Sequence, residues 1–166
     1  MAGGWGALFK RGKKISDFIC TISAEITHNH PEGIKGAQSI ALGVMLGRQG
    51  NTKKEIKDLL EKLFEYDLNQ SLDEIRPSYS HDVSCQGSVP QAIISFLESE
   101  DFEDAIRNAI SLGGDADTQA CIAGALAEGF YKKIPDRIEE FVLNKMTPDI
   151  FSIINQFKNK IRIVLN

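Results

Sequence analysis

Apolar residues in this chain recur with the three- and four-residue spacing of α-helices, and no segment alternates in the manner of a β-strand. Ile15–Thr27 and Pro31–Leu46 each carry an apolar stripe, and the spacing returns from Ile56 to Phe64. A chain of 166 residues is long enough to bury one hydrophobic core. The pattern predicts an all-α fold, a single-domain helical bundle spanning residues 1–166.

Helix ends are indicated by capping residues. Boxes of the form S/T-x-x-E/Q predict helix starts at Thr52, Ser71 and Ser88. Asp101 is predicted to cap a helix over Phe102–Leu112, which Gly113 ends. Two further amphipathic helices are predicted at Pro135–Asn144 and Thr147–Val164.

Small residues occupy nearly all sides of the segment Ala120–Tyr131. Because small side chains let other helices approach closely, we expect this segment to be the central and most buried helix, with Ala123 and Ala125 in the core. Glycine is costly inside a helix, so each one indicates close backbone contact with a neighbouring helix or with a ligand. The predicted helix at Pro31–Leu46 carries three of them: Gly33, Gly36 and Gly43.

Composition and charge exclude several classes of function. The net charge is −4, from 19 basic and 23 acidic residues, so a nucleic-acid surface is not expected. No apolar run reaches the ~18 residues that cross a bilayer, so no membrane partner is expected. The cysteines are odd in number and widely spaced, which predicts buried free thiols and a cytoplasmic protein. They are Cys20, Cys85 and Cys121.

The segment Gly113–Thr118 has the strongest chemical signature, since two glycines precede two carboxylates and a hydroxyl. The segment directly precedes the predicted central helix. Hard cations such as Mg²⁺ prefer oxygen ligands, and glycines let a ligand approach the backbone closely. The alternative is an ordinary N-cap, in which one aspartate caps the helix and the other is solvated.

Two other segments carry weaker signals. His28 and His30 lie at a helix junction, but no third ligand is placed to complete a zinc site, and His28 capping the preceding helix is the better interpretation. Cys85 lies next to a helix start, yet no histidine is spaced to activate it, so a buried structural thiol is expected.

Together, Thr27–Gly33, Cys85–Pro90 and Asp104–Thr118 resemble the ADP-ribosylglycohydrolase family, in the family's order. The likeness runs from about Ile15 to Ile134. It implies an all-α bundle that hydrolyses the glycosidic bond joining ADP-ribose to a protein side chain or to another ADP-ribose-type group. It also implies a pair of divalent cations, normally Mg²⁺, and ADP-ribose or an ADP-ribosylated protein as the binding partner.

The resemblance assigns roles to individual residues. Asp115, Asp117 and Thr118 match the family's C-terminal metal-ligand motif. His28 matches a position beside the nucleotide part of the substrate. The glycines ahead of the aspartates, Gly113 and Gly114, are expected to contact the substrate. No catalytic residue is assigned.

Other family motifs do not occur in this sequence: the G-D-x-x-G segment, the T-D-D-T-type segment and the G-N-G-type loop. The likeness is therefore to the C-terminal part, without the family's N-terminal helices. Two dications about 3.5–4 Å apart need several carboxylates, so weak Mg²⁺ binding and little activity from this chain alone are expected. Apolar surface left uncovered predicts a homo-oligomer or pairing with a missing N-terminal half.

Two functions other than hydrolysis are open from the sequence. The first is a non-catalytic module that binds ADP-ribose or a nucleotide through His28 and the Asp115 loop. The second is a structural helical oligomerisation domain in which Asp115 is only a cap. Titration with Mg²⁺ and with ADP-ribose separates them, since the hydrolase binds both, the module binds the nucleotide without metal and the structural domain binds neither.

Overall fold

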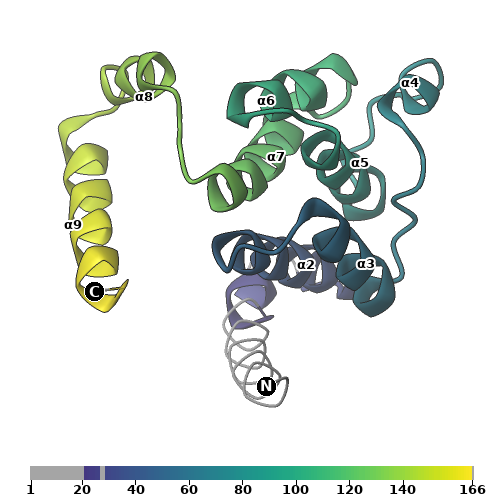
Figure 1. Ribbon diagram of the computed structural model, residues 1–166, viewed down its shortest axis with the longest axis horizontal. Helices are drawn as coiled ribbons and strands as arrows, with labels where there is room; N and C mark the ends of the chain where they lie inside the picture. Colours follow the sequence, from purple (N-terminus) through teal and green to yellow (C-terminus); the bar gives the residue numbers. More distant parts are fainter. Residues whose placement is uncertain (1–20, 27–28, 166) are drawn as a thin grey trace. The chain divides into compact units, whose positions relative to one another are not determined.

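The computed structural model describes residues 21–26 and 29–165, with side chains described as far as residue 159. These ranges contain helices and no strand, which confirms the all-α prediction. Residues 21–26 are the described part of the first predicted helix and are helical. The labelled helices of Figure 1 are α2 (Pro31–Arg48), α3 (Lys53–Phe64), α4 (Leu72–Ile75), α5 (Cys85–Leu97), α6 (Phe102–Ser111), α7 (Ala116–Tyr131), α8 (Asp136–Leu143) and α9 (Pro148–Leu165).

The chain divides into two compact units, one ending at Lys133 and the other beginning at Ile134. The first unit contains α2 to α7, and the second contains α8 and α9. Within the second unit, Lys158 of α9 forms an ion pair with Glu139 of α8, with 2.7 Å between nitrogen and oxygen. The prediction of a single domain over residues 1–166 stays a prediction.

Helix α7 is the centre of the first unit, because it packs against α6, α2 and α5. The sequence predicted that α7 is also the most buried helix, and this prediction is wrong. Helix α5 buries a larger share of its residues, including the unbroken run 92–96. The reason is that α7 keeps one face outside the packing: Ala123 is fully buried, whereas Ala125 and Cys121 are exposed.

Helices α2 and α7 run in the same direction and approach each other closely. Gly43 lies against the side chain of Leu126, and Gly47 lies against the backbone of Phe130. A Cβ atom built on Gly129 would come within 3.1 Å of the backbone oxygen of Val44, so this part of α7 needs glycine for space. Close contact at Gly43 was predicted from the sequence.

The C-terminal end of α7 is enclosed by polar and aromatic contacts. The Tyr131 hydroxyl donates to the carbonyl of Ser99, which follows α5, over 2.7 Å. The ammonium of Lys53, at the start of α3, also donates to that carbonyl. It lies 5.2–5.7 Å from the centres of three rings, those of Phe96, Phe130 and Tyr131. We call these five residues the closed end of α7.

Most predicted helix starts are confirmed. Thr52 and Ser71 form complete capping boxes at α3 and α4. Asp101 caps α6 by accepting the backbone N–H of Asp104 over 2.8 Å.

The start of α5 was predicted wrongly. Its N-cap is Ser84, and the predicted cap, Ser88, is buried one turn inside the helix. The Ser88 hydroxyl donates to the backbone carbonyl of Asp82 over 2.8 Å instead of capping. Pro90 is tolerated inside α5 because its missing N–H releases only the carbonyl of Gln86, an exposed residue of the first turn.

Candidate functional site

The segment Gly113–Thr118, which leads from α6 into the first turn of α7, holds the predicted metal ligands, and we call it the acidic loop. Gly113 has a φ of 75°, a left-handed conformation that ends α6 and that residues with a Cβ adopt only at a cost. Asp115 is then the N-cap of α7 and is half-buried. Asp117 and Thr118 follow in the first turn, and both are exposed.

The N-cap of α7 differs from the N-caps of α2 to α6. Each of those helices begins with a residue whose side chain accepts a hydrogen bond from a first-turn N–H: His30, Thr52, Ser71, Ser84 and Asp101. Asp115 makes no such hydrogen bond. Its carboxylate is therefore not used in capping, although aspartate is one of the best N-cap residues.

The two carboxyl groups of the acidic loop interact with each other. The pKa of Asp117 lies below its ordinary value, first because of a hydrogen bond with the Asp115 side chain and then because of the Thr118 backbone N–H. That N–H donates to Asp117 Oδ1 over 3.0 Å. His81, on the connection from α4 to α5, lowers the same pKa through its charge. Two acidic side chains thus converge at the N-terminus of a helix, where negative charge is favoured.

This donor set suits a hard divalent cation in part. Asp115, Asp117 and Thr118 offer two carboxylates and a hydroxyl, the oxygen ligands that Mg²⁺ accepts. Among residues 21–26 and 29–165, however, no group of three or more His, Cys, Asp or Glu side chains gathers in a way that could hold a metal ion. The loop fits one cation whose remaining ligands come from elsewhere, and it does not supply enough carboxylates for two.

Tyr79 and Gln119 were missed by the sequence analysis. Gln119 lies in the first turns of α7, is fully buried and donates its amide Nε2 to the Tyr79 hydroxyl over 2.5 Å. That hydroxyl in turn donates to the backbone carbonyl of Gly87 in α5 over 2.7 Å. The Tyr79 ring lies against Gly114, where a Cβ atom would fall 2.4 Å from Cε1. A glycine at position 114 is therefore explained by the space that the Tyr79 ring occupies, whereas the sequence analysis had assigned Gly114 to substrate contact.

Burial raises the pKa of Tyr79, and the charges of Asp82 and Asp115 raise it further. Its hydroxyl therefore stays protonated at neutral pH and can donate its hydrogen bond. A substrate-contacting role for Gly113 and Gly114 stays a prediction.

The N-termini of α2, α5 and α7 lie at one end of the first unit. Helices α2 and α7 run in the same direction, as their glycine contacts require. Helices α5 and α7 are also parallel, because Tyr79 joins their starts while Ser99 and Tyr131 join their ends. The positive ends of these three helix dipoles thus lie at the same end of the first unit as the acidic loop, an arrangement that favours an anionic ligand there.

His28 lies outside the described residues, so its place relative to the acidic loop stays a prediction. His30, two residues later, is the N-cap of α2, and its Nδ1 accepts the backbone N–H of Glu32 over 3.2 Å. It is exposed and lies at the same end of the first unit as Asp115.

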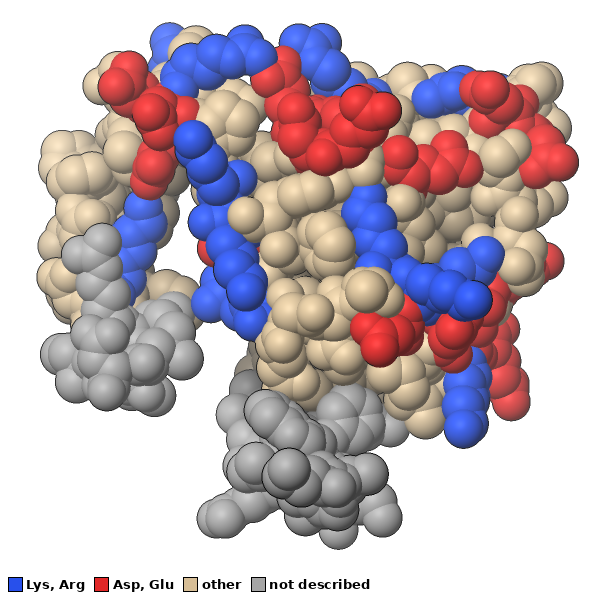
Figure 2. All heavy atoms as spheres, viewed as in Figure 1, with Lys and Arg blue, Asp and Glu red and all other residues tan. Residues whose placement is uncertain are grey.

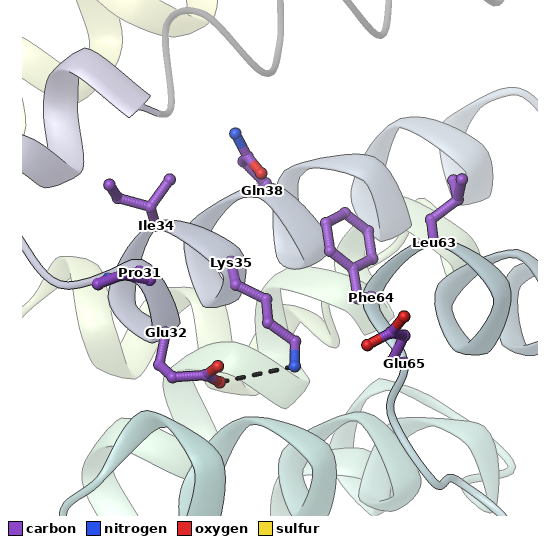
Figure 3. A pocket seen from close by; sticks show the side chains of 8 residues that line it. All are labelled: Pro31, Glu32, Ile34, Lys35, Gln38, Leu63, Phe64 and Glu65. Carbon is purple, nitrogen blue, oxygen red and sulfur yellow. Dashed lines mark ion pairs between the residues drawn. The ribbon is translucent and has the colours of Figure 1, made fainter.

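A groove of about 670 Å³ lies between the start of α2 and the end of α3 (Figure 3). Five residues of α2 and three at the end of α3 line it: Pro31, Glu32, Ile34, Lys35, Gln38, Leu63, Phe64 and Glu65. Within it, Lys35 pairs with Glu32 over 3.6 Å. The lining is part apolar and part charged, and it includes no residue of the acidic loop, so the groove is separate from the candidate metal ligands.

The cysteines are only partly as predicted. Cys85 and Cys121 are free thiols. The prediction that they are buried is wrong, since Cys85 is half-buried and Cys121 is exposed on the open face of α7. Cys20 lies outside the described residues.

Charged side chains of both signs are interspersed on the face shown in Figure 2. The expectation that nucleic acid is not a partner stays a prediction. None of the helices in the described part of the chain is both long and apolar enough to cross a membrane.

Comparison with known proteins gives three results. The sequence model of the ADP-ribosylglycohydrolase family matches residues 7–161. An uncharacterized protein of Archaeoglobus fulgidus is 30% identical over 149 residues, which cover 80% of this chain and 48% of that relative. The human ADP-ribosylhydrolase ARH3 is 31% identical over 155 residues, with 66% of this chain and 43% of ARH3 covered. The chain thus spans about half the length of these curated relatives, and no solved structure matches it.

Proposed function

Because this chain belongs to the ADP-ribosylglycohydrolase family, we propose that it carries the C-terminal metal-binding loop of a hydrolase that cleaves ADP-ribosylated substrates. The family uses divalent metal ions. The observation that carries the proposal is the N-cap of α7: Asp115 makes no capping hydrogen bond, and its carboxyl group meets that of Asp117. Such a pair is better explained by cation binding than by helix capping.

In this proposal Asp115, Asp117 and Thr118 hold Mg²⁺. When bound, Mg²⁺ would act as a Lewis acid toward ribose hydroxyls or the attacking water. The N-termini of α2, α5 and α7 favour the negatively charged diphosphate of ADP-ribose at the same end of the first unit. His28 would lie beside the nucleotide, and Gly113 and Gly114 would leave room for the substrate at the backbone.

Activity of the chain alone is expected to be weak. Glycoside cleavage needs a positioned water and stabilisation of an oxocarbenium-like transition state, and one loop with two carboxylates does this poorly. We propose that the remaining ligands come from another polypeptide segment or from a second copy of the chain. The free thiols Cys85 and Cys121 support a cytoplasmic location.

Calorimetric titration with Mg²⁺ and with ADP-ribose, followed by hydrolysis of an ADP-ribosylated protein, tests this function. We expect measurable binding of both ligands and little turnover. Asp115→Asn and Asp117→Asn should abolish Mg²⁺ binding, whereas Asp58→Asn, the same change at an exposed site on α3, should not. Mg²⁺ binding that survives both loop substitutions would overturn the proposal.

A non-catalytic ADP-ribose-binding module is the second candidate, and it is favoured by the three helix N-termini, which attract anions without a metal. It predicts ADP-ribose binding that is unchanged by EDTA. If the chain is instead a structural oligomerisation domain, it should bind neither ligand. That function requires the Asp115 side chain to accept a capping hydrogen bond, which it does not.

A further inference from the structure

Tyr79 joins two helices at the end where the acidic loop lies. Its hydroxyl donates to the Gly87 carbonyl of α5 over 2.7 Å and accepts from Gln119 Nε2 of α7 over 2.5 Å. Gln119 is fully buried, and its Oε1 has no hydrogen-bond partner. The bond to the Tyr79 hydroxyl is therefore the hydrogen bond that anchors the Gln119 side chain. Gln119 is the residue directly after Thr118.

The Tyr79 ring also supports the backbone of the acidic loop. Gly114 lies so close to the ring that a Cβ atom would be 2.4 Å from Cε1 and 3.1 Å from the hydroxyl oxygen. Tyr79 thus contacts the residue before Asp115 with its ring and the residue after Thr118 with its hydroxyl. The three predicted metal ligands lie between these two contacts.

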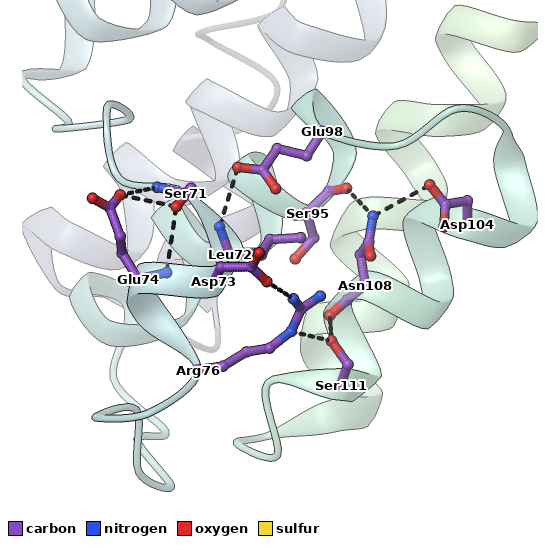
Figure 4. Close-up of polar contacts among 10 residues, drawn as sticks. All are labelled: Ser71, Leu72, Asp73, Glu74, Arg76, Ser95, Glu98, Asp104, Asn108 and Ser111. Atoms are coloured by element: carbon purple, nitrogen blue, oxygen red, sulfur yellow. Dashed lines mark hydrogen bonds and ion pairs between the residues drawn. The ribbon is translucent and has the colours of Figure 1, made fainter.

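Tyr79 itself is held in place. Three residues earlier, the Arg76 guanidinium donates Nε to the Ser111 hydroxyl over 3.1 Å and pairs through Nη1 with Asp73 over 2.5 Å (Figure 4). Ser111 is the last residue of α6, two residues before Gly113. The backbone N–H of Tyr79 donates to the carbonyl of Ile75 over 3.0 Å. The connection after α4 is therefore fastened to the element that leads into the acidic loop.

Asp115 makes no capping hydrogen bond, and the side chains of Asp117 and Thr118 are exposed. A carboxylate pair binds a cation well only when its oxygens are held at the right separation, and the groups that orient metal ligands commonly set the affinity. In this chain that role falls to a residue outside the predicted motif.

We propose that Tyr79 is a positioning residue for the acidic loop, which it holds in the arrangement that a divalent cation requires. This inference rests on the proposed function, because it assumes that Asp115 and Asp117 bind the cation. It adds a residue from the irregular connection between α4 and α5, which the sequence motifs did not include.

Electron paramagnetic resonance with Mn²⁺ as the probe tests this inference on the full chain. Tyr79→Phe keeps the ring but removes the hydroxyl, and we expect it to raise the Mn²⁺ dissociation constant about 10-fold or more. Tyr131→Phe is the matched control, since that hydroxyl also donates to a carbonyl over 2.7 Å but at the closed end of α7. It should leave Mn²⁺ binding unchanged.

A second variant keeps the test decisive if Tyr79→Phe folds poorly. Gln119→Met removes the other partner of the same hydrogen bond, so it should weaken Mn²⁺ binding as well, and the double variant should lose little more than either single one. Helical circular dichroism of each variant gives the fraction folded.

The outcomes separate the two proposals. If wild type binds Mn²⁺ and Asp117→Asn does not, but Tyr79→Phe and Gln119→Met bind as wild type does, the positioning role is wrong and the metal loop stands. An equal loss in Tyr131→Phe would also overturn it, because the effect would then be one of general stability. If wild type does not bind Mn²⁺, or if both loop aspartates can be replaced without loss, the metal function itself fails.

Discussion

The two ends of α7 differ in whether their polar side chains are bonded to other parts of the protein. At the closed end, Tyr131, Ser99 and Lys53 satisfy one another through hydrogen bonds, and aromatic rings surround the lysine ammonium. At the other end, Asp115 makes no capping bond and Asp117 and Thr118 are exposed. Polar groups that are bonded to other helices stabilise the fold, whereas carboxylates that are at least partly exposed and bonded only within their own loop remain accessible to a ligand. The same helix thus provides stability at one end and binding capacity at the other.

The largest effect is expected at the closed end. Phe96 is fully buried, and its ring packs edge-on against Phe130 with 5.6 Å between centroids. Phe96→Ala should lower the free energy of unfolding by about 3–5 kcal/mol, as measured by denaturant titration. Phe96→Leu, which keeps most of the volume, should cost no more than about 1.5 kcal/mol. If Phe96→Ala behaved like the leucine variant, this end would not be tightly packed.

The middle of α7 offers a matched pair. Ala123 is fully buried and Ala125 is exposed. Ala123→Leu should overpack the helix against its neighbours and cost about 1–3 kcal/mol of unfolding free energy. Ala125→Leu makes the same change toward solvent and should stay within about 0.5 kcal/mol of wild type. Equal effects in the two denaturant curves would contradict the packing of α7.

At the acidic loop, stability and binding can be separated with two glycines. Gly113 and Gly50 both have left-handed backbones, with φ of 75° and 84°, and neither has a neighbour in the space that a Cβ would fill. Alanine at either position should cost about 1–2 kcal/mol of unfolding free energy. Only Gly113→Ala should also weaken Mn²⁺ binding, because Gly50 lies in the turn between α2 and α3. Weaker binding in both variants would remove the distinction.

The smallest expected effect is on the pH dependence of stability. The folded pKa of Asp117 is lowered from its ordinary value of 3.8, so its contribution is present above that value and is lost as the pH falls through the folded pKa. Without metal, the free energy of unfolding should therefore fall less steeply in acid for Asp117→Asn than for wild type. Chemical unfolding at a series of pH values measures this, and a steeper fall in the variant would show that the sign is wrong.

Helix starts were predictable where the signal was local. Thr52 and Ser71 cap as their boxes require, because each box needs only residues three apart. Ser88 has the same local pattern, yet its hydroxyl bonds to Asp82 and the helix begins earlier. The connection from α4 determines that Ser84, and not Ser88, is the N-cap of α5. This connection has no regular apolar spacing from which its structure could be predicted.

The site was predictable only in part for a related reason. Asp115, Asp117 and Thr118 form a continuous motif and could be found from the sequence. The contribution of Tyr79 depends on packing between distant segments, since it meets Gly114 and Gln119 across 35 residues or more, and a buried glutamine looks the same in sequence as a solvated one. The same limit explains Ala125 and Cys121, because a helix with small residues all round does not indicate which face is covered.

The close approach of α2 and α7 at Gly47 and Gly129 also sets the axial register of α7. With backbone against backbone, neither helix can slide past the other without forcing a side chain into space that only a hydrogen atom occupies. Gly129 lies about 21 Å along the helix axis from Asp115, at about 1.5 Å per residue. The crossing therefore fixes the position of Asp115 and Asp117 along the axis of α7. We expect a methyl group added at Gly129 to shift both aspartates, although it contacts neither of them.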